Sequence, residues 1–436
     1  MAKRAPLAHE SWLPEANSPT TDFPLTHLPY GVFEQDGEQR VCVAIGAHLL
    51  DLNAACDLLP AGLTAACRSS SLNALMSLGP RAWRMLRTDV AALLHVSVEP
   101  SRREAAEAAL HSIAGATLLK PVQIPNYTDF YASIDHAMRV GQLFRPDQPL
   151  LPNYKYVPIG YHGRASSVVP SGVAIRRPSG QVRPAPATDQ PAFLRTDSLD
   201  YELEIGMYVG QANAMGDPIP ISDASKHLFG VSLLNDWSAR DIQAWEYQPL
   251  GPFLGKSFAT SVSPWVTPMA ALVPFRGPAV RRSGADPKPL PYLHSAEDQA
   301  HGSLNATLEV LISSRTMREN GLAAFRLSES SARDLYWTPA QLVAHHTSNG
   351  CNLEVGDLLA TGTISGESEE SAGCLLELTR NGAQPIALPT GEMRRFLADG
   401  DEIVLRGYCE APGYPRIGLG ECRGAILAAR SSSVRE

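Results

Sequence analysis

The sequence predicts a mainly β protein of the α+β class, built from two domains. A chain of 436 residues exceeds the usual size of a single hydrophobic core, and its 44% hydrophobic content is ample for two. Beyond about residue 120 the chain becomes rich in Gly, Pro and short β-branched runs, which is typical of irregular sheets. We therefore expect an N-terminal domain over residues 1–120, a C-terminal domain over 121–430, and a disordered tail at 431–436.

The N-terminal region mixes short strands with helices. Residues 31–33, 40–45 and 48–50 are β-like runs, and the Ala- and Leu-rich segments 72–86 and 102–113 have helical spacing with few breakers. Residues 118–125 carry Pro121 and Pro125, which indicates the linker that leaves this domain.

The C-terminal region is dominated by predicted strands. We expect them at residues 166–169, 202–209, 265–267, 306–312, 375–378 and 403–408. Helices are predicted at 222–229, 239–245 and 338–348, the last because Thr338 and Pro339 make a good N-cap and N1 pair. The polar stretch 278–302 is expected to be an exposed excursion.

Charge and cysteine content narrow the function classes. A net charge of −8 without a basic stripe argues against nucleic acid and anionic membranes as partners, which leaves small molecules. No stretch has the length of a membrane span, and no apolar region follows the first basic residues, so we expect a cytoplasmic protein. The seven cysteines form no C-x-x-C pair, which favours free thiols in a reducing compartment.

Four carboxylates stand among residues that normally lie inside. Glu202 and Glu204 belong to a predicted strand and project from the same face, because side chains alternate along a strand. Asp129 lies in an aromatic segment, and Asp236 follows the apolar run 231–234. Buried carboxylates need a cation or strong hydrogen bonds. A set of oxygen ligands without Cys or His favours a hard divalent ion, Mg²⁺ or Ca²⁺, over zinc.

A histidine and an acid suggest acid–base chemistry near these carboxylates. His136 follows Asp129 by seven residues and is a candidate general base for water, although a lone His is more often structural. Glu377, within the apolar run 375–378, could orient that His or could face solvent.

Cationic and amide side chains follow Asp236. Arg240 and Gln243 share a face of the predicted helix and could stabilise an oxyanion, or they belong to a surface helix with salt bridges. Lys256 stands among small and apolar residues. Buried beside carboxylates it would stay charged and act on a carbanion or enolate; otherwise its stem merely covers apolar surface.

Two small-residue loops, 160–164 and 359–366, would let backbone approach a ligand. Neither has the pattern of a P-loop or a dinucleotide fingerprint, so no nucleotide cofactor is expected. No G-x-S-x-G elbow occurs, which argues against a serine-nucleophile hydrolase.

Several long motifs, in order, resemble the fumarylacetoacetate hydrolase family. They are DFYASIDHA, LLPNYKYVPIGYHGRASSVVPSG, IRRPSGQ, DYELEIG, LLNDWSARDIQAWEYQPLGPFLGKSFATS, TGTISG and DGDEIVLRGYC, and the resemblance runs from about residue 10 to 425. It implies a small SH3-like N-terminal barrel, a β-rich catalytic domain of mixed sheets, and a homodimer. The implied activity is hydrolysis of fumarylacetoacetate to fumarate and acetoacetate, the last step of tyrosine and phenylalanine catabolism, by metal-assisted attack of water with an enolate leaving group.

The resemblance also assigns roles to residues. It implies that Asp129, Glu202, Glu204 and Asp236 bind Mg²⁺ or Ca²⁺, and that Lys256 and Thr260 belong to a second, Mg²⁺-type site near Asp236. His136 corresponds to the proton acceptor and Glu377 to its partner, with Arg240, Gln243 and Lys256 as the oxyanion-stabilising set. Positions that contact substrate correspond to Tyr131, Arg145, Tyr161, Gln243, Tyr247 and Thr363. Arg145 and Tyr247 rest on the resemblance alone. Departures from the family pattern are the stretch 183–196 and the excursion 278–302.

Two rival functions share part of this pattern. An acylpyruvate hydrolase, or a 2-keto acid decarboxylase or isomerase, uses a similar acid cluster, but the long N-terminal region and the GYHGRASSVV segment favour the fumarylacetoacetate activity. A non-enzymatic, metal-stabilised protein would not need His136, Glu377 or Lys256.

Overall fold

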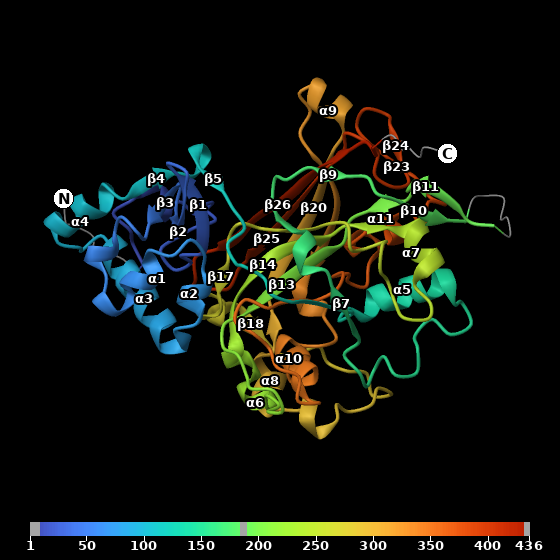
Figure 1. Cartoon of the computed structure of the whole chain (residues 1–436), viewed down its shortest axis with the longest axis horizontal. Coiled ribbons are helices and arrows are strands. Elements are labelled where there is room, and N and C mark those ends of the chain that lie inside the picture. The colour runs from blue at the N-terminus through green and yellow to red at the C-terminus, as the bar shows by residue number, and fades with distance from the viewer. Residues whose placement is uncertain (1–8, 184–189, 431–436) are drawn as a thin grey trace.

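The computed structural model describes residues 9–183 and 190–430, so the tail at 431–436 and part of the stretch 183–196 lie outside the described residues. Within the described part the chain is strand-rich with both helices and sheets, which confirms the α+β expectation. Figure 1 shows the first hundred or so residues as one lobe of mixed helices and strands beside a larger, strand-rich body.

The N-terminal lobe contains a five-stranded antiparallel sheet in the order β4-β3-β2-β1-β5. Its strands are β1 (Tyr30–Gln35), β2 (Glu38–Ile45), β3 (His48–Asp51), β4 (Leu110–Ser112) and β5 (Thr117–Leu118). The three predicted strands are therefore confirmed. Four α-helices accompany the sheet: α1 (Thr64–Cys67), α2 (Asn73–Met76), α3 (Gly79–Leu94) and α4 (Pro100–Glu107).

Two predicted helices differ in extent from those observed. The segment 72–86 is divided at Gly79, whose φ of +81° marks a turn between α2 and α3, and α3 continues to Leu94. The predicted helix 102–113 ends at Glu107, because Leu110 pairs with Leu50 at the sheet edge. Long-range strand pairing thus overrides local helical propensity.

An eight-stranded sheet carries the candidate site. Seven of its strands follow the order β7-β6-β22-β13-β14-β16-β8, and β17 also pairs with β14. Their bounds are β6 (Tyr127–Phe130), β7 (Gly160–Gly163), β8 (Val168–Pro170), β13 (Leu203–Val209), β14 (Leu228–Asp236), β16 (Thr260–Val262), β17 (Thr267–Pro268) and β22 (Leu358–Ala360). The short strand β22 lies between β6 and β13, parallel to the first and antiparallel to the second. It sets their separation although it comes more than a hundred residues later in the chain.

A second sheet packs against the first. It has five strands in the order β21-β20-β25-β26-β9, where β14 contacts both β25 and β26. The strands are β9 (Ile175–Arg176), β20 (Ala306–Ser313), β21 (Phe325–Ser331), β25 (Glu402–Cys409) and β26 (Ile417–Leu427). Leu233, Leu405 and Leu419 are fully or almost fully buried between the sheets. Within the described residues, eight short strands pair outside these sheets: β10 (Ser179–Val182) with β11 (Ala192–Arg195), β12 (Leu199–Asp200) with β15 (Ser238–Ala239), β18 (Arg276–Gly277) with β19 (Ser303–Leu304), and β23 (Ile386–Ala387) with β24 (Met393–Arg394).

The lobe and the larger body share a hydrophobic core. Tyr30 of β1 and Val266 exchange two backbone hydrogen bonds of 2.9 and 2.7 Å. Val122, within the predicted linker, is buried in the same core. Burial of this segment indicates that the lobe is held against the body by apolar packing as well as by the chain itself.

Two of the three helices predicted in the C-terminal region are confirmed, and the third is confirmed only in its first half. Helix α10 (Pro339–Thr347) begins at the predicted N-cap, where Thr338 and Gln341 form a capping box. Helix α7 (Arg240–Glu246) is also confirmed. The predicted helix 222–229 is wrong over its second half, since α6 (Ile221–Ala224) is followed by a 3₁₀ turn and β14 takes up Leu228 and Phe229.

One further prediction is wrong, and another needs refinement. Residues 375–378 form a helical turn, α11 (Leu375–Leu378), because a buried carboxylate, Asp200, accepts hydrogen bonds from the N–H groups of Leu375 and Leu376. The stretch 278–302 is mostly exposed or half-buried, as expected, but Leu293 is fully buried and Asp298 of helix α8 (Ala296–His301) accepts a hydrogen bond from Thr338. Among the described residues no helix has both the length and the apolar character needed to cross a membrane.

Candidate active site

The four predicted metal carboxylates meet at one point of the eight-stranded sheet. Asp129 ends β6, Glu204 lies on β13, Asp236 ends β14, and Glu202 immediately precedes β13. One oxygen from each lies within 4.8 Å of the others, and all four side chains are buried. The strand pairings create this cluster, since Asp129 is opposite Ala360 of β22 and Glu204 is opposite Leu234 of β14.

The cluster has excess negative charge that its neighbours only partly offset. Burial, reinforced by the charge of Asp236, raises the pKa of Asp129 to about 8. Burial and the neighbouring carboxylates also raise the pKa of Glu204 well above its ordinary value. The pKa of Glu202 is lowered instead; burial opposes this shift, but Lys256 and Arg240 outweigh burial.

The donor set fits a hard divalent cation. All four candidate ligands are carboxylates, and the buried Oε1 of Glu204 has no hydrogen-bond partner. The backbone N–H of Gly362 lies 3.1 Å from Asp129 Oδ1 and 3.0 Å from Glu204 Oε2, so it donates toward both acids. A buried acidic cluster able to hold a divalent ion is therefore present, as the sequence predicts.

The carboxylate of Asp236 also accepts hydrogen bonds from three side chains. Thr260 Oγ1 donates to Oδ1 at 2.9 Å, while Tyr161 Oη and Lys256 Nζ donate to Oδ2 at 2.8 and 2.9 Å. Lys256 also donates to Glu202 Oε2. It is therefore buried among carboxylates rather than covering apolar surface, and although burial opposes it, Asp236 and Glu202 keep its pKa above the ordinary value.

Arg240 is buried at the opposite side of Glu202. Its Nε donates to Asp200 at 2.9 Å, and its Nη1 donates to Glu202 Oε1 at 2.7 Å and to Gln243 Oε1 at 3.1 Å. These contacts exclude the alternative of a surface salt-bridge helix for the start of α7.

His136 and Glu377 form a buried pair. His136 lies in the first turn of α5 (Ile134–Phe144), whose N-cap is Ser133. Its Nδ1 lies 2.6 Å from Glu377 Oε2. Burial opposes ionisation of Glu377, but His136 holds the pKa of Glu377 down at about 2. Because an ionised carboxylate only accepts, the Nδ1–H of His136 is the donor, and Nε2 is left without that proton.

Three residues around this pair had no role in the sequence analysis. Ser365 Oγ and Cys374 Sγ donate to Glu377 Oε2 at 2.9 and 3.1 Å, and Arg139 Nη1 donates to Oε1 at 3.1 Å. Arg139 had a sequence signal, since it lies one turn after His136 on the same helix face. Ser365 and Cys374 had none, because tertiary folding alone brings them to Glu377.

One cavity of about 570 Å³ joins these groups. Predicted site residues that line it are Asp129, Tyr131, His136, Arg145, Tyr161, Glu202, Arg240, Gln243, Tyr247, Lys256 and Thr363. The buried Arg145 Nε and Thr363 Oγ1 have no hydrogen-bond partner among the described residues. Glu204, Asp236 and Glu377 do not line the cavity but contact residues that do, and Thr260 donates to Asp236 behind it. The structure thus brings every predicted site residue into one assembly.

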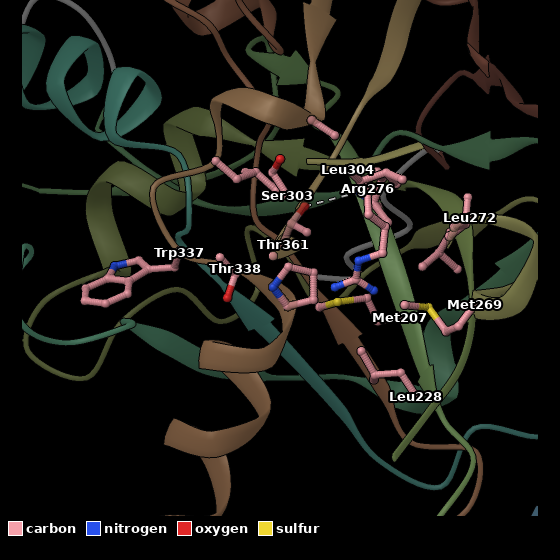
Figure 2. Close-up of a pocket in the computed structure, with 16 residues that line it drawn as sticks. Met207, Leu228, Met269, Leu272, Arg276, Ser303, Leu304, Trp337, Thr338 and Thr361 are labelled. Carbon is pink, nitrogen blue, oxygen red and sulfur yellow. Dashed lines mark hydrogen bonds between the residues drawn. The ribbon is translucent and has the colours of Figure 1, made fainter. Parts of the chain in front are cut away.

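A much smaller pocket lies on the other face of β13. It measures about 30 Å³ and is lined by Ile205 and Met207, which alternate along the strand with Glu204. Figure 2 shows the apolar side chains of Met207, Leu228, Met269 and Leu272 around it. Its size and apolar lining exclude this small pocket as the place for a polar substrate.

Comparison with known proteins assigns the chain to a family. The profile described as Fumarylacetoacetase N-terminal matches residues 26–121, and that described as Fumarylacetoacetate (FAA) hydrolase C-terminal matches residues 126–427. The fumarylacetoacetases of Bos taurus and Homo sapiens are each 46% identical to this chain, over 97% and 96% of its length and 99% of theirs. That of Arabidopsis thaliana is 43% identical over 93% of this chain and 96% of its own.

A solved structure agrees at the level of the fold. The fumarylacetoacetate hydrolase of Exiguobacterium antarcticum superposes with a TM-score of 0.51 at 18% identity, covering 92% of this chain and 99% of that one. Matching profiles across both regions and full-length relatives at this identity lead to one conclusion: the chain belongs to the fumarylacetoacetate hydrolase family.

Proposed function

We propose that this chain hydrolyses the carbon–carbon bond of 4-fumarylacetoacetate to give fumarate and acetoacetate, the last step of tyrosine and phenylalanine catabolism. The observation that carries the proposal is the meeting, around one cavity, of a buried acidic cluster, a His–Glu pair and buried cationic donors. Full-length similarity to fumarylacetoacetases supports this choice of substrate.

Asp129, Glu202, Glu204 and Asp236 would hold a Mg²⁺ or Ca²⁺ ion. Such an ion supplies Lewis acidity for the oxygens of a 1,3-dicarbonyl and positive charge to balance an enolate. Four carboxylates against Lys256 and Arg240 leave a net charge of −2, which one divalent ion neutralises. Lys256 and Thr260 would flank a second ion near Asp236; in the described geometry both side chains act as donors to Asp236.

His136 acts as the general base. Since Nδ1 is held by Glu377 at 2.6 Å, Nε2 accepts the proton of a water molecule. Glu377 fixes the ring orientation and stabilises the imidazolium without taking the proton. The hydroxide then attacks the carbonyl next to the fumaryl group.

The oxyanion of the tetrahedral intermediate meets Arg240, Gln243 and Lys256. Gln243 uses its carbonyl oxygen to accept from Arg240, which leaves its amide N–H groups free to donate. Lys256 offsets the charge of the acetoacetate enolate as the bond breaks, before that carbon is protonated.

The outer part of the cavity would bind the terminal carboxylate. Arg145 offers the bidentate geometry that carboxylates prefer. Tyr131, Tyr161, Tyr247 and Thr363 supply hydroxyl groups along the same cavity. Donors placed at both ends of the substrate hold the reacting carbonyl near the base.

The chain is also proposed to act as a cytoplasmic homodimer. Leu250 and Phe253, next to the cavity, are 96% and 69% exposed, and such apolar surface favours a protein partner. All seven cysteines are free, which supports a reducing compartment. Light scattering of the purified chain tests the dimer, and a monomeric mass at micromolar concentration contradicts it.

The activity is tested by the loss of fumarylacetoacetate absorbance on adding metal-loaded protein, beside an acylpyruvate and the chelated enzyme. Rapid metal-dependent release of fumarate and acetoacetate supports the proposal. Turnover of the acylpyruvate alone would keep the site and move the chain to a sister activity, and no turnover of either refutes both.

A further inference from the structure

Asp200 is a buried acid that belongs neither to the acidic cluster nor to the cavity lining. It lies on β12, two residues before Glu202, and its side chain is fully buried. Its Oδ1 accepts from the backbone N–H groups of Leu375 and Tyr201 at 2.8 and 2.9 Å. Its Oδ2 accepts from Leu376 N–H and from Arg240 Nε, both at 2.9 Å. Both oxygens are therefore fully used.

The Asp200 contact decides which edge of Arg240 faces the substrate. A guanidinium has five N–H groups in one plane. Nε is held by Asp200, and Nη1 is divided between Glu202 and Gln243. Nη2 is buried and has no partner among the described residues, while Arg240 lines the cavity. Two unused N–H groups are thus left on the one nitrogen that the surrounding acids do not hold.

Glu202 alone would not fix this orientation. It also accepts from Lys256 and belongs to the acidic cluster, so its position depends on the charge held there. The second hydrogen bond, from Arg240 Nε to Asp200, holds the guanidinium at two points and so fixes its plane.

Asp200 is also linked to His136, the proposed base, through helix α11. Leu375 and Leu376 begin α11, and the next residue of that helix is Glu377, the partner of His136. A single carboxylate therefore bridges Arg240 and the turn that carries Glu377, which sets the spacing between the oxyanion donor and the base.

We propose that Asp200 is a positioning residue. It orients Arg240 so that Nη2 of Arg240 donates to the oxyanion, and it fixes the distance between Arg240 and the Glu377–His136 pair. The inference rests on the proposed function, because it takes Arg240 as the oxyanion donor. Asp200 itself touches neither the substrate nor the reacting atoms.

The test is a double-mutant cycle on fumarylacetoacetate hydrolysis with Asp200→Asn, Arg240→Met and the double variant. Removing an oriented oxyanion donor costs about 10²-fold in kcat. We expect Asp200→Asn to approach that loss with KM within about threefold of the wild type. The double variant should be no slower than Arg240→Met alone, because Asp200 acts through Arg240.

A matched control separates positioning from stability. Asp401 is another buried acid that pairs with an arginine, Arg394, at 2.8 Å, and it lies outside the cavity lining. Asp401→Asn should lower the melting temperature but leave kcat within about threefold. Equal kcat losses in Asp401→Asn and Asp200→Asn would mean that any buried acid has this effect, and would overturn the inference.

Two further variants keep the inference testable if Asp200→Asn or Arg240→Met does not fold. Asp200→Ser keeps a hydroxyl acceptor near the N–H groups of α11 but removes the charge from Arg240. Arg240→Lys leaves Asp200 intact and keeps the positive charge without the planar fork. We expect Arg240→Lys to lose as much kcat as Arg240→Met. Near-normal turnover by Arg240→Lys, or losses that multiply in the double variant, would refute the positioning role; absence of turnover by the wild type would instead refute the proposed function.

Discussion

Removing the divalent ion should make the stability of this protein depend steeply on pH. In the ion-free chain burial raises the pKa of Asp129 to about 8 from an unfolded value of 3.8, so the folded chain retains a proton that the unfolded chain releases. Between these two values the folded state binds more protons, and stability therefore falls as pH rises from about 4 to about 8. By linkage, the shift of Asp129 alone corresponds to about 5 kcal/mol at pH 8.

With the ion bound the four acids are ionised and neutralised, and this loss should disappear. Urea unfolding of the metal-loaded and verified metal-free protein from pH 5 to pH 8.5 measures the difference. The gap between the two unfolding free energies should widen with pH by several kcal/mol, and Asp129→Asn should remove much of the widening. Parallel curves for the two forms would refute the assignment of the cluster as a cation site.

Three other perturbations follow from the described contacts. His136→Ala should lower kcat/KM by several orders of magnitude while the metal-induced rise in melting temperature remains; near-normal turnover of metal-loaded His136→Ala would mean that another group is the base. Gly362→Ala should abolish metal-induced stabilisation, because φ is +75° and the added Cβ would lie 2.1 Å from the carbonyl oxygen of Phe130; Gly413→Ala, also at positive φ but with open space around it, is the control, and equal ion affinity in both contradicts the argument. Burial lowers the pKa of His27 to about 3, so the free energy of unfolding of the protein falls as pH drops from about 6.5 toward 3. His27→Gln should make the free energy of unfolding depend less on pH over that range. An unchanged pH dependence would contradict this assignment.

The sequence predicted the acid cluster because its signals are local. Alternation along one strand places Glu202 and Glu204 on the same face, and the structure confirms their meeting with Asp129 and Asp236. The roles of these residues and the domain boundary near residue 120 stay predictions.

The wrong predictions result from tertiary contacts that the local sequence does not reveal. Residues 375–378 are apolar enough for a strand, yet Asp200, 175 residues earlier, accepts the first N–H groups of a helical turn there. The sequence could not reveal that contact, nor could it reveal the cavity that gathers Arg145 and Tyr247 with His136. The alternatives left open for Glu377 and Lys256 were decided by burial, which is a property of the whole fold.

The central place of β22 has a consequence for the order of folding. Asp129 and Glu204 lie on β6 and β13, and these strands have no direct pairing in the sheet, because residues 358–360 lie between them. During synthesis the ribosome therefore completes β6, β13 and β14 long before the strand that joins them. The four-acid site is complete only once residue 360 has emerged, because β22 sets Asp129 against the three acids, Glu202, Glu204 and Asp236, that the pairing of β13 with β14 already brings together.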